Sequence, residues 1–549
     1  MTLLCLILIP LLGGLLAWYS QGFNPNLPRR ISLFTLITSL VYITALTLTR
    51  PLARSSQWLF DESHAWIDRF NITAHFSMDG LSLILILLTL LMGLAALSSA
   101  WSEIDKHQGF FYFNFLWTLA GIIGVFLAMD LLLFFVFWEV MLVPMYFLIA
   151  IWGHENRRYA ALKFFLFTQA GGLLMLLSII ALVVFHYQQT GLLSFNYHVL
   201  TLTPIASPMA IWICLGFIIA FLVKLPAFPF HPWLPDAHTQ APTAASIILA
   251  AILLKTGGYG IIRFVLPLFP DAVQFWSPLM MTLAVASIIY GALMAFSQHD
   301  LKRIVAYSSV SHMGFVLLGC FSLNMIALQG AVMQMLAHGL SSAALFMLVG
   351  LIQQRFHSRD LHQFSGLWRY LPQLSAMGLF FAIATLGMPG LGNFIGEFLV
   401  LVGALEQHTS FAVLASLGLI LGAVYSLRMI QKSFFGPFSS ADSRPQDSTT
   451  ETMIHSRVTE KLHNTDTEIQ ANLASIATGD QASAKEAEQV KPPTLPSPYP
   501  DLSLKEKLTL MSIAAGLLLL GIHPQPLLDM LAQPLAQVLA LYTITGSAS

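Results

Sequence analysis

The chain has 549 residues, of which 56% are hydrophobic and only 10% charged, and its formal net charge at pH 7 is −1. Soluble domains carry about 25% charged residues, so this composition excludes a large globular enzyme and indicates a polytopic membrane protein. The three cysteines stand alone in apolar runs, no His/Cys cluster has metal-ligand spacing, and no basic patch is present. These absences argue against iron–sulfur clusters, a metal site and nucleic-acid binding.

Apolar runs of membrane length predict about fourteen transmembrane helices, and therefore an all-α polytopic fold. The first run has no basic flank and no clear cleavage site, which predicts an uncleaved helix rather than a signal peptide. The approximate cores of the predicted spans, in chain order, are 3–20, 31–49, 78–99, 112–129, 131–151, 162–186, 209–230, 244–266, 276–296, 304–322, 326–352, 375–404, 411–435 and 508–531.

The spans fall into groups, and two blocks of five share one pattern. In each block the fourth span is interrupted, at LPAFPFHPWLP in the first and at LGMPGLGNFIGE in the second. Because five is odd, the second copy must be inverted in the membrane, as in transporter repeats. Breaks at membrane depth need protein or water as hydrogen-bond partners, so they predict hydrated cavities. The predicted segments are an N-terminal three-helix segment (1–105), the two five-helix repeats (112–266 and 276–435), a polar, disordered cytoplasmic loop (437–506) and a C-terminal transmembrane helix with a tail (507–549).

The basic residues predict an orientation. If the N-terminus is outside, 20 of the 26 Lys and Arg residues lie on the inner side, 4 lie outside and two lie within the membrane. Loops on the cytoplasmic side carry an excess of Lys and Arg, so both termini are expected on the outer side.

Six ionisable side chains interrupt the predicted spans. A charged group at mid-bilayer costs roughly 2.5–3.5 kcal/mol on insertion scales, so six of them require a function. A buried polar path for protons or ions would supply it. The six are Glu139, Lys224, Lys255, His312, His338 and Glu397.

Lys224 lies two residues before Pro226 at the first break, and Glu139 is its predicted acidic partner. Burial disfavours the protonated lysine and a nearby carboxylate favours it, so a balanced pair can accept and release a proton. A static ion pair that fixes helix packing is the alternative. Lys255 stands mid-span beside Gly257 and Gly258, which permit close helix approach, and its depth argues against snorkelling to an interface.

The histidines allow two interpretations. His312 and His338 lie mid-span among Ser and Gly, where each could bond a neighbouring helix or relay protons. His231, at the first break, is a comparable candidate, whereas His238 beside Asp236 is expected at the cytoplasmic mouth. Glu397 follows the Gly-rich second break. Asp130 and Asp300 stand at span ends without a special role, and Asp61, Glu62 and Asp68 are expected to be solvated loop charges.

Four segments resemble the antiporter-like membrane subunits of proton-pumping NADH:quinone oxidoreductase (respiratory complex I) and their Mrp-type antiporter relatives. They are WEVMLVPMYFLI, KLPAFPFHPWLPDAHTQAPTAASIILAAILLKTGGYG, HDLKRIVAYSSVSHMGF and GMPGLGNFIGEF, and the resemblance covers roughly 75–435. It implies fourteen helices with inverted repeats, with Glu139 and Lys224 controlling proton uptake and Lys255 as central relay. The resemblance also matches His231, His312 and His338 to intramembrane histidines of that family. Glu397, a lysine in most sister subunits, favours the M-type branch.

The resemblance implies a proton-translocating membrane-arm subunit that has no redox site of its own. NAD, FMN, iron–sulfur clusters and quinone are then expected in partner subunits, and flanking antiporter-like subunits and the lipid bilayer are the expected neighbours. The expected location is the bacterial inner membrane, with periplasmic termini. A subunit of a Mrp-type cation/proton antiporter and a passive structural subunit are the alternatives. The 437–506 segment is longer than the resemblance implies.

Overall fold

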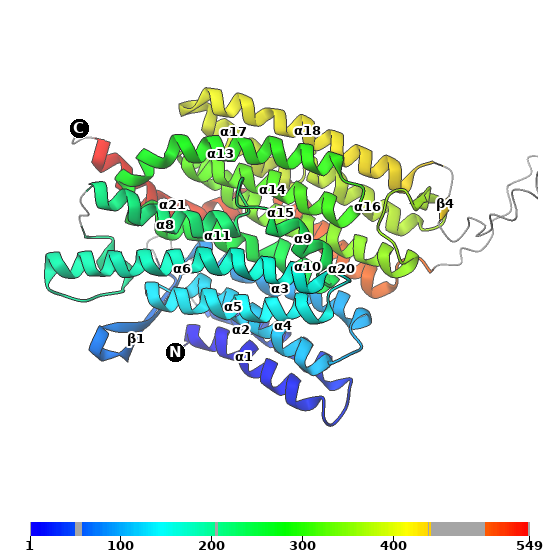
Figure 1. The fold of residues 1–549 in the computed structure, drawn as a ribbon, viewed down its shortest axis with the longest axis horizontal. Helices are drawn as coiled ribbons and strands as arrows, with labels where there is room; N and C mark the ends of the chain where they lie inside the picture. The colour runs from blue at the N-terminus through cyan, green and yellow to red at the C-terminus, as the bar shows by residue number, and fades with distance from the viewer. Residues whose placement is uncertain (1, 50–57, 204–206, 437–438, 441–499, 547–549) are drawn as a thin grey trace, which may run out of the picture.

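The computed structural model describes residues 2–49, 58–203, 207–436, 439–440 and 500–546, which form a bundle of helices running side by side along one axis (Figure 1). Within these residues, eleven helical stretches are long and apolar enough to cross a membrane. The predicted polytopic helical class is therefore confirmed. The eleven are α1 (Thr2–Ser20), α2 (Leu27–Thr49), α3 (Gly80–Glu103), α4 (Gln108–Leu127), α5 (Leu131–Trp152), α6 (Arg157–Thr190), the continuous stretch Thr243–Leu268, α13 (Pro270–Ser297), α14 (Leu301–Phe321), α15 (Met325–Phe356) and α18 (Thr409–Phe434).

Three predicted spans are interrupted. Two of the interruptions were predicted from Pro and Gly: α8 (Ser207–Lys224) stops before α9 (Trp233–Gln240), and α16 (Pro372–Thr385) stops before α17 (Gly392–Gln407). The third was not, because 508–531 was expected as one helix. The chain there forms α20 (Leu504–Ile522) and α21 (Gln525–Gly546), inclined at 70° to each other. Pro524 lies at the bend, where it lacks a backbone donor.

The stretch Thr243–Leu268 is one helix with two wider turns. It consists of α10 (Thr243–Ile248), the π-helical turn η2 (Leu249–Leu253), α11 (Leu254–Gly260), the π-helical turn η3 (Ile261–Val265) and α12 (Leu266–Leu268). Such π-helical turns inside α-helices are frequent at functional sites.

Short acidic or amide side chains begin several helices. Asp79 accepts a hydrogen bond from Ser82 N (2.9 Å), Asp130 from Leu132 N (3.0 Å) and Asp300 from Arg303 N (3.2 Å). Each satisfies a backbone donor that the first helical turn leaves unpaired. Asp130 and Asp300, expected to stand at span ends, are therefore N-caps.

The described chain is not entirely α-helical. Strands β1 (Phe60–Ile67) and β2 (Ile72–Met78) form an antiparallel hairpin around the single turn η1 (Asp68–Phe70), where a solvated loop was expected. Glu62 accepts a 3.0 Å hydrogen bond from Thr2 N, and Asp61 bonds His75 and Ser77, so these two carboxylates are not simply solvated. A second, minimal pairing joins β3 (Phe364–Ser365) to β4 (Ser439–Ser440). The remaining short helices are α7 (Tyr197–Leu200) and η4 (Leu367–Arg369).

Glycines bring the helices of the bundle into close contact. A Cβ on Gly330 of α15 would meet the backbone nitrogen of Val400 on α17 at 2.6 Å, and one on Gly257 would meet Phe221 O on α8 at 2.7 Å. Small residues at such contacts are typical of membrane helices, whose association depends on tight packing. The apolar stretches of α14, α15 and Thr243–Leu268 are entirely buried, so their polar side chains face protein.

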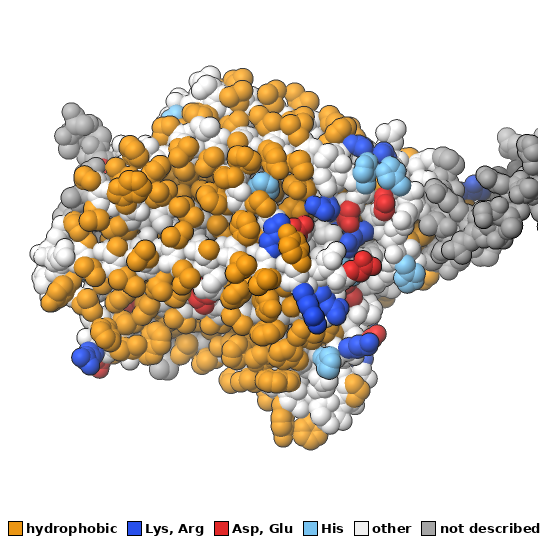
Figure 2. Space-filling view, in the orientation of Figure 1, with side chains coloured by type: hydrophobic (Ala, Val, Ile, Leu, Met, Phe, Trp, Pro, Cys, Tyr) orange, Lys and Arg blue, Asp and Glu red, His pale blue; other side chains and the backbone are white. Residues whose placement is uncertain are grey.

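The two ends of the bundle differ in charge. Figure 2 shows a broad hydrophobic surface over most of one face and a concentration of Lys, Arg, Asp, Glu and His at the right-hand end. The start of α1 and the end of α21 lie toward the opposite, left-hand end (Figure 1).

Candidate proton path

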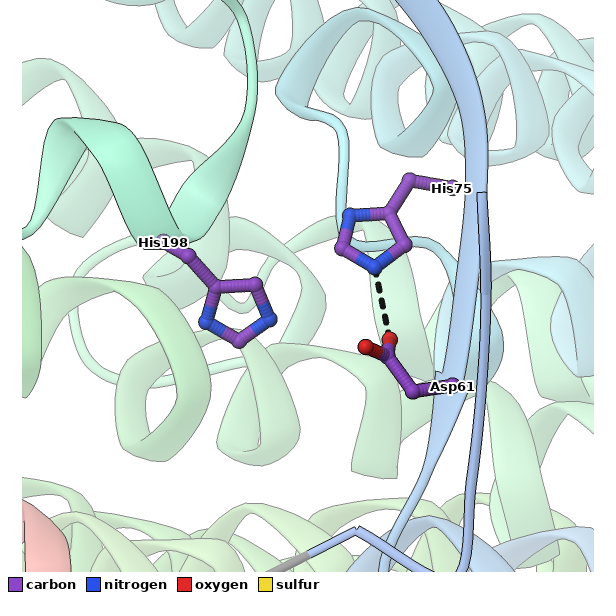
Figure 3. Close-up of side chains that lie close together, drawn as sticks. All are labelled: Asp61, His75 and His198. Atoms are coloured by element: carbon purple, nitrogen blue, oxygen red, sulfur yellow. Dashed lines mark hydrogen bonds and ion pairs between the residues drawn. The ribbon is translucent and has the colours of Figure 1, made fainter. Parts of the chain in front are cut away.

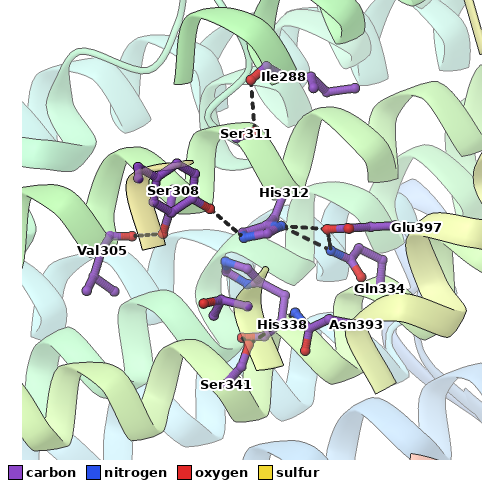
Figure 4. Close-up of polar contacts among 12 residues, drawn as sticks. Ile288, Val305, Ser308, Ser311, His312, Gln334, His338, Ser341, Asn393 and Glu397 are labelled. Carbon is purple, nitrogen blue, oxygen red and sulfur yellow. Dashed lines mark hydrogen bonds and ion pairs between the residues drawn. The ribbon is translucent and has the colours of Figure 1, made fainter. Parts of the chain in front are cut away.

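Four side chains meet around Glu397 and are named here the central cluster: His312, Gln334, Glu397 and Tyr425. His312 Nδ1 lies 2.7 Å from Glu397 Oε1, and Gln334 Nε2 donates to the same oxygen at 2.8 Å (Figure 4). The Tyr425 hydroxyl lies 3.2 Å from the other ring nitrogen, Nε2, of His312. Glu397 is 2% exposed, so a carboxylate buried in the bundle receives its hydrogen bonds from protein.

Lys255 reaches the same region from α11. Its Nζ donates to Ala250 O at 2.6 Å and lies 2.8 Å from His338 Nδ1. Ala250 precedes Lys255 by five residues, within the turn η2, where the wider helical geometry leaves carbonyls free of the usual i−4 bond. The rings of His338 and His312 are 5.5 Å apart, centroid to centroid. Lys255 and Glu397 are therefore separated by two adjacent histidines.

The first break is organised differently. Lys224 is fully buried at the end of α8, and its Nζ has no hydrogen-bond partner; it lies over the rings of Trp138 (5.2 Å) and Phe164 (5.6 Å). Glu139 Oε1, on α5, also has no hydrogen-bond partner. The two charges interact electrostatically, but no ion pair within 4.0 Å joins them among the described residues. The predicted partners are thus near one another without direct contact.

The two histidines near the first break are both buried. His231 packs among the rings of Phe228, Tyr290 and Tyr307, and its Nδ1 has no hydrogen-bond partner. His238 was expected at a cytoplasmic mouth, and this is wrong, because the residue is 0% exposed and stacks on Phe346 at 4.4 Å. Neither ring nitrogen of His238 has a partner.

Two lysines contact α9 and the residue that follows it. Lys163 Nζ lies 2.6 Å from Asp236 Oδ2, and the buried Lys302 donates to Ala241 O at 2.8 Å. A polar cavity of about 510 Å³ lies close by, lined in part by His154, Asp300, Gln353 and Arg359. Burial, with the positive charges of Lys302 and Arg359, lowers the pKa of His154 to about 4. His154 is therefore neutral at pH 7.

Sequence reasoning missed Gln334 and Tyr425. Gln334 could have been found, because it stands mid-span four residues before His338, on the same helical face. Tyr425 carries no such signal, since a single tyrosine among apolar residues is common in buried helices.

The arrangement is suited to moving protons. A proton passes between groups within about 2.6–3.2 Å, directly or through one water, and the Lys255–His338 and His312–Glu397 contacts meet that requirement.

Comparison with known proteins identifies relatives. Residues 128–422 match the family described as "NADH:quinone oxidoreductase/Mrp antiporter, TM". The chain is 45% identical to NADH-quinone oxidoreductase subunit M of Escherichia coli over 539 residues, covering 96% of each chain. It resembles a chain of respiratory complex I from Thermus thermophilus, with a TM-score of 0.80 and 28% identity, covering 98% of this chain and 100% of that one. A chain of the Mrp complex from Dietzia sp. shares the fold, with a TM-score of 0.78 and 22% identity, covering 98% and 97%.

Proposed function

Because the chain belongs to the subunit M family of NADH-quinone oxidoreductase, a proton-translocating enzyme, we propose that it carries protons along a buried line of its own side chains. The line consists of Glu139, Lys224, Lys255, His338, His312 and Glu397, with His231 as a candidate side branch.

The observation that supports this proposal best is the contact series from Lys255 to Glu397. Lys255 lies 2.8 Å from His338, and His312 lies 2.7 Å from Glu397. The 5.5 Å between the two ring centroids is short enough for a ring rotation or one bridging water to complete the transfer. A neutral histidine accepts a proton on one nitrogen and releases one from the other, which suits both rings to this task.

The first half of the line works as a switch in this proposal. Lys224 has no hydrogen-bond partner, so small movements of Glu139 change how strongly the ammonium is favoured. When Glu139 is close, Lys224 holds its proton; when it withdraws, Lys224 releases the proton toward Lys255. Redox energy from partner subunits would move the pair.

We infer the partner subunits and the membrane location of the chain from the same family. Flanking antiporter-like subunits would contact the chain, and NAD, FMN, iron–sulfur clusters and quinone would bind in other subunits. We place the chain in a bacterial inner membrane with fourteen crossings, two inverted five-helix repeats and periplasmic termini. The start of α1 and the end of α21 lie toward the same end of the bundle, opposite the charged end, and this supports the orientation. A Mrp-type antiporter is less well supported, because 22% identity indicates the fold alone.

The test replaces Lys255 with methionine in the assembled complex and follows NADH-driven quinone reduction and acidification in membrane vesicles. We expect Lys255→Met to lower both by more than about ten-fold, since relay groups contribute about 10²–10⁴-fold to proton transfer. Lys106→Met is the matched control, because Lys106 is exposed between α3 and α4, and it should behave as wild type. Full acidification in assembled Lys255→Met complex would refute the relay.

A further inference from the structure

Three potential metal ligands gather near the hairpin, at the end of the bundle opposite the charged end. Asp61 lies on β1, His75 on β2 and His198 on α7, and one ligand atom from each lies within 4.8 Å of the others (Figure 3). His75 Nε2 is 2.7 Å from Asp61 Oδ1, and the ring of His198 is 5.4 Å from that of His75, centroid to centroid. The proposed proton path uses none of these side chains.

The cluster is buried on the side of His75 and open to solvent on the side of Asp61. The side chain of His75 is 5% exposed and that of Asp61 is 50% exposed, so an ion could arrive from solvent. Arg263 interacts with His198, but its charge is balanced by a buried ion pair with Asp79. The local field therefore does not repel a cation strongly.

We propose that Asp61, His75 and His198 bind one divalent transition-metal ion, with Zn²⁺ as the best fit. Two imidazoles and one carboxylate, with a fourth position open to water, form a set typical of zinc sites. Tetrahedral ligands at about 2.0–2.1 Å lie about 3.3 Å apart, so the three side chains need to move by roughly an ångström or less. Ca²⁺ and Mg²⁺, which prefer oxygen ligands, fit poorly.

Asn196 limits the strength of this site. Its Oδ1 caps α7 by accepting from His198 N at 2.9 Å, and its Nδ2 lies 2.9 Å from His75 Nδ1. Metal binding through His75 Nε2 places the proton on Nδ1, where it would face an amide that also donates. Ligating histidines normally donate this proton to a carboxylate or carbonyl. An aspartate at position 196 would accept from both His198 N and His75 Nδ1, and should therefore tighten binding.

A bound ion would tie the hairpin to α7. The hairpin already meets the neighbouring backbone through Met129 N, which donates to His75 O at 2.9 Å, and through Thr73 N, which donates to Asp130 at 3.2 Å. The ion would add a link from these strands to the segment between α6 and α8. Because the folded chain would bind it and the unfolded chain would lack the preformed site, thermal stability should rise with its concentration.

The experiment titrates chelator-treated, purified complex with ZnCl₂, using a competing chromophoric chelator to measure affinity and thermal unfolding to measure stabilisation. We expect one saturable site in the wild type that raises the unfolding temperature. His198→Ala and Asp61→Asn should each weaken Zn²⁺ binding by at least about ten-fold, and Asn196→Asp should strengthen it by about 10–100-fold, the usual scale of outer-shell effects.

His64→Ala is the matched control, because His64 is an exposed histidine on β1, the strand that carries Asp61, and lies outside the cluster. It should leave binding unchanged. Equal affinity in wild type and His198→Ala, loss of binding in His64→Ala, or no saturable binding at all would each overturn the site. Co²⁺ substitution gives an independent readout, since the expected tetrahedral absorption should disappear in His198→Ala even if that variant is less stable.

Discussion

At the second helix break Glu397 takes part in two close polar contacts, with His312 and Gln334, whereas at the first break Lys224 has no hydrogen-bond partner at all. Both side chains are almost fully buried, so the difference is in their partners and not in their exposure. A hydrogen-bonded buried network rigidifies its surroundings, while a buried charge without a hydrogen-bond partner is costly and sensitive to small movements. The second break therefore suits storage of a proton, and the first suits control over its release.

The largest expected effect comes from breaking the central cluster. Glu397→Ala removes the acceptor shared by His312 and Gln334, which leaves His312 Nδ1 and Gln334 Nε2 only their 3.4 Å contact with each other. A buried donor left without a partner costs about 1–3 kcal/mol. We expect both lower thermal stability and loss of NADH-driven acidification. Glu397→Gln is the control, since it retains an oxygen acceptor and should recover much of the stability without the proton transfer. Wild-type unfolding temperature and acidification in Glu397→Ala would contradict the proposed role.

Lys224→Met should separate function from stability. The substitution removes a buried ammonium without a hydrogen-bond partner and keeps an unbranched apolar side chain between Trp138 and Phe164. The substitution removes the desolvation cost of the ammonium, whereas Glu139, which is only partly buried, loses a favourable charge nearby. These two effects oppose each other, so the unfolding temperature should change little. Acidification should fall. A marked loss of stability would show instead that Lys224 holds the helices together, as in a static ion pair.

The smallest expected effect is on the pH dependence of stability, and it comes from His154, which lies outside the membrane-spanning helices. The pKa of His154 is about 4 in the folded chain, below the usual 6.5, so between these values the unfolded chain binds more protons. The stability that this residue contributes is complete above pH 6.5 and declines as the pH falls toward 4. His154→Gln should flatten the pH dependence of the unfolding temperature in this interval. An unchanged profile would assign the acid sensitivity to other groups.

The sequence predicted the helices better than it predicted the hairpin and the bend between α20 and α21. Hydropathy located the spans, because a backbone in lipid must satisfy its hydrogen bonds internally, and Pro and Gly marked both breaks. The hairpin was missed because FDESHAWI lacks the alternation of polar and apolar residues that predicts a strand. The bend between α20 and α21 was missed because the apolar run continues through Pro524.

For the proton path, the sequence predicted residue types but not contacts. Intramembrane charge alone selected Lys255 and Glu397, since its cost requires a function. The contact of Lys255 with His338 joins residues 83 positions apart, and no single-sequence pattern reports such a distance. His238 was misplaced because the neighbouring Asp236 suggested a solvated mouth. The side chain of Asp236 instead bonds Lys163, while His238 turns into the bundle.

The positions of the two breaks also decide which sign of charge each region can hold. Lys224 is the last residue of α8, at the end where the aligned peptide dipoles leave roughly half a negative charge, so the helix terminus itself favours a cation there. Glu397 lies in the second turn of α17, near the positive end of that helix, where a carboxylate is favoured, though more weakly. An unbroken helix would place neither terminus inside the bundle. Exchanging the lysine and the glutamate would therefore set both charges against the backbone field that now supports them.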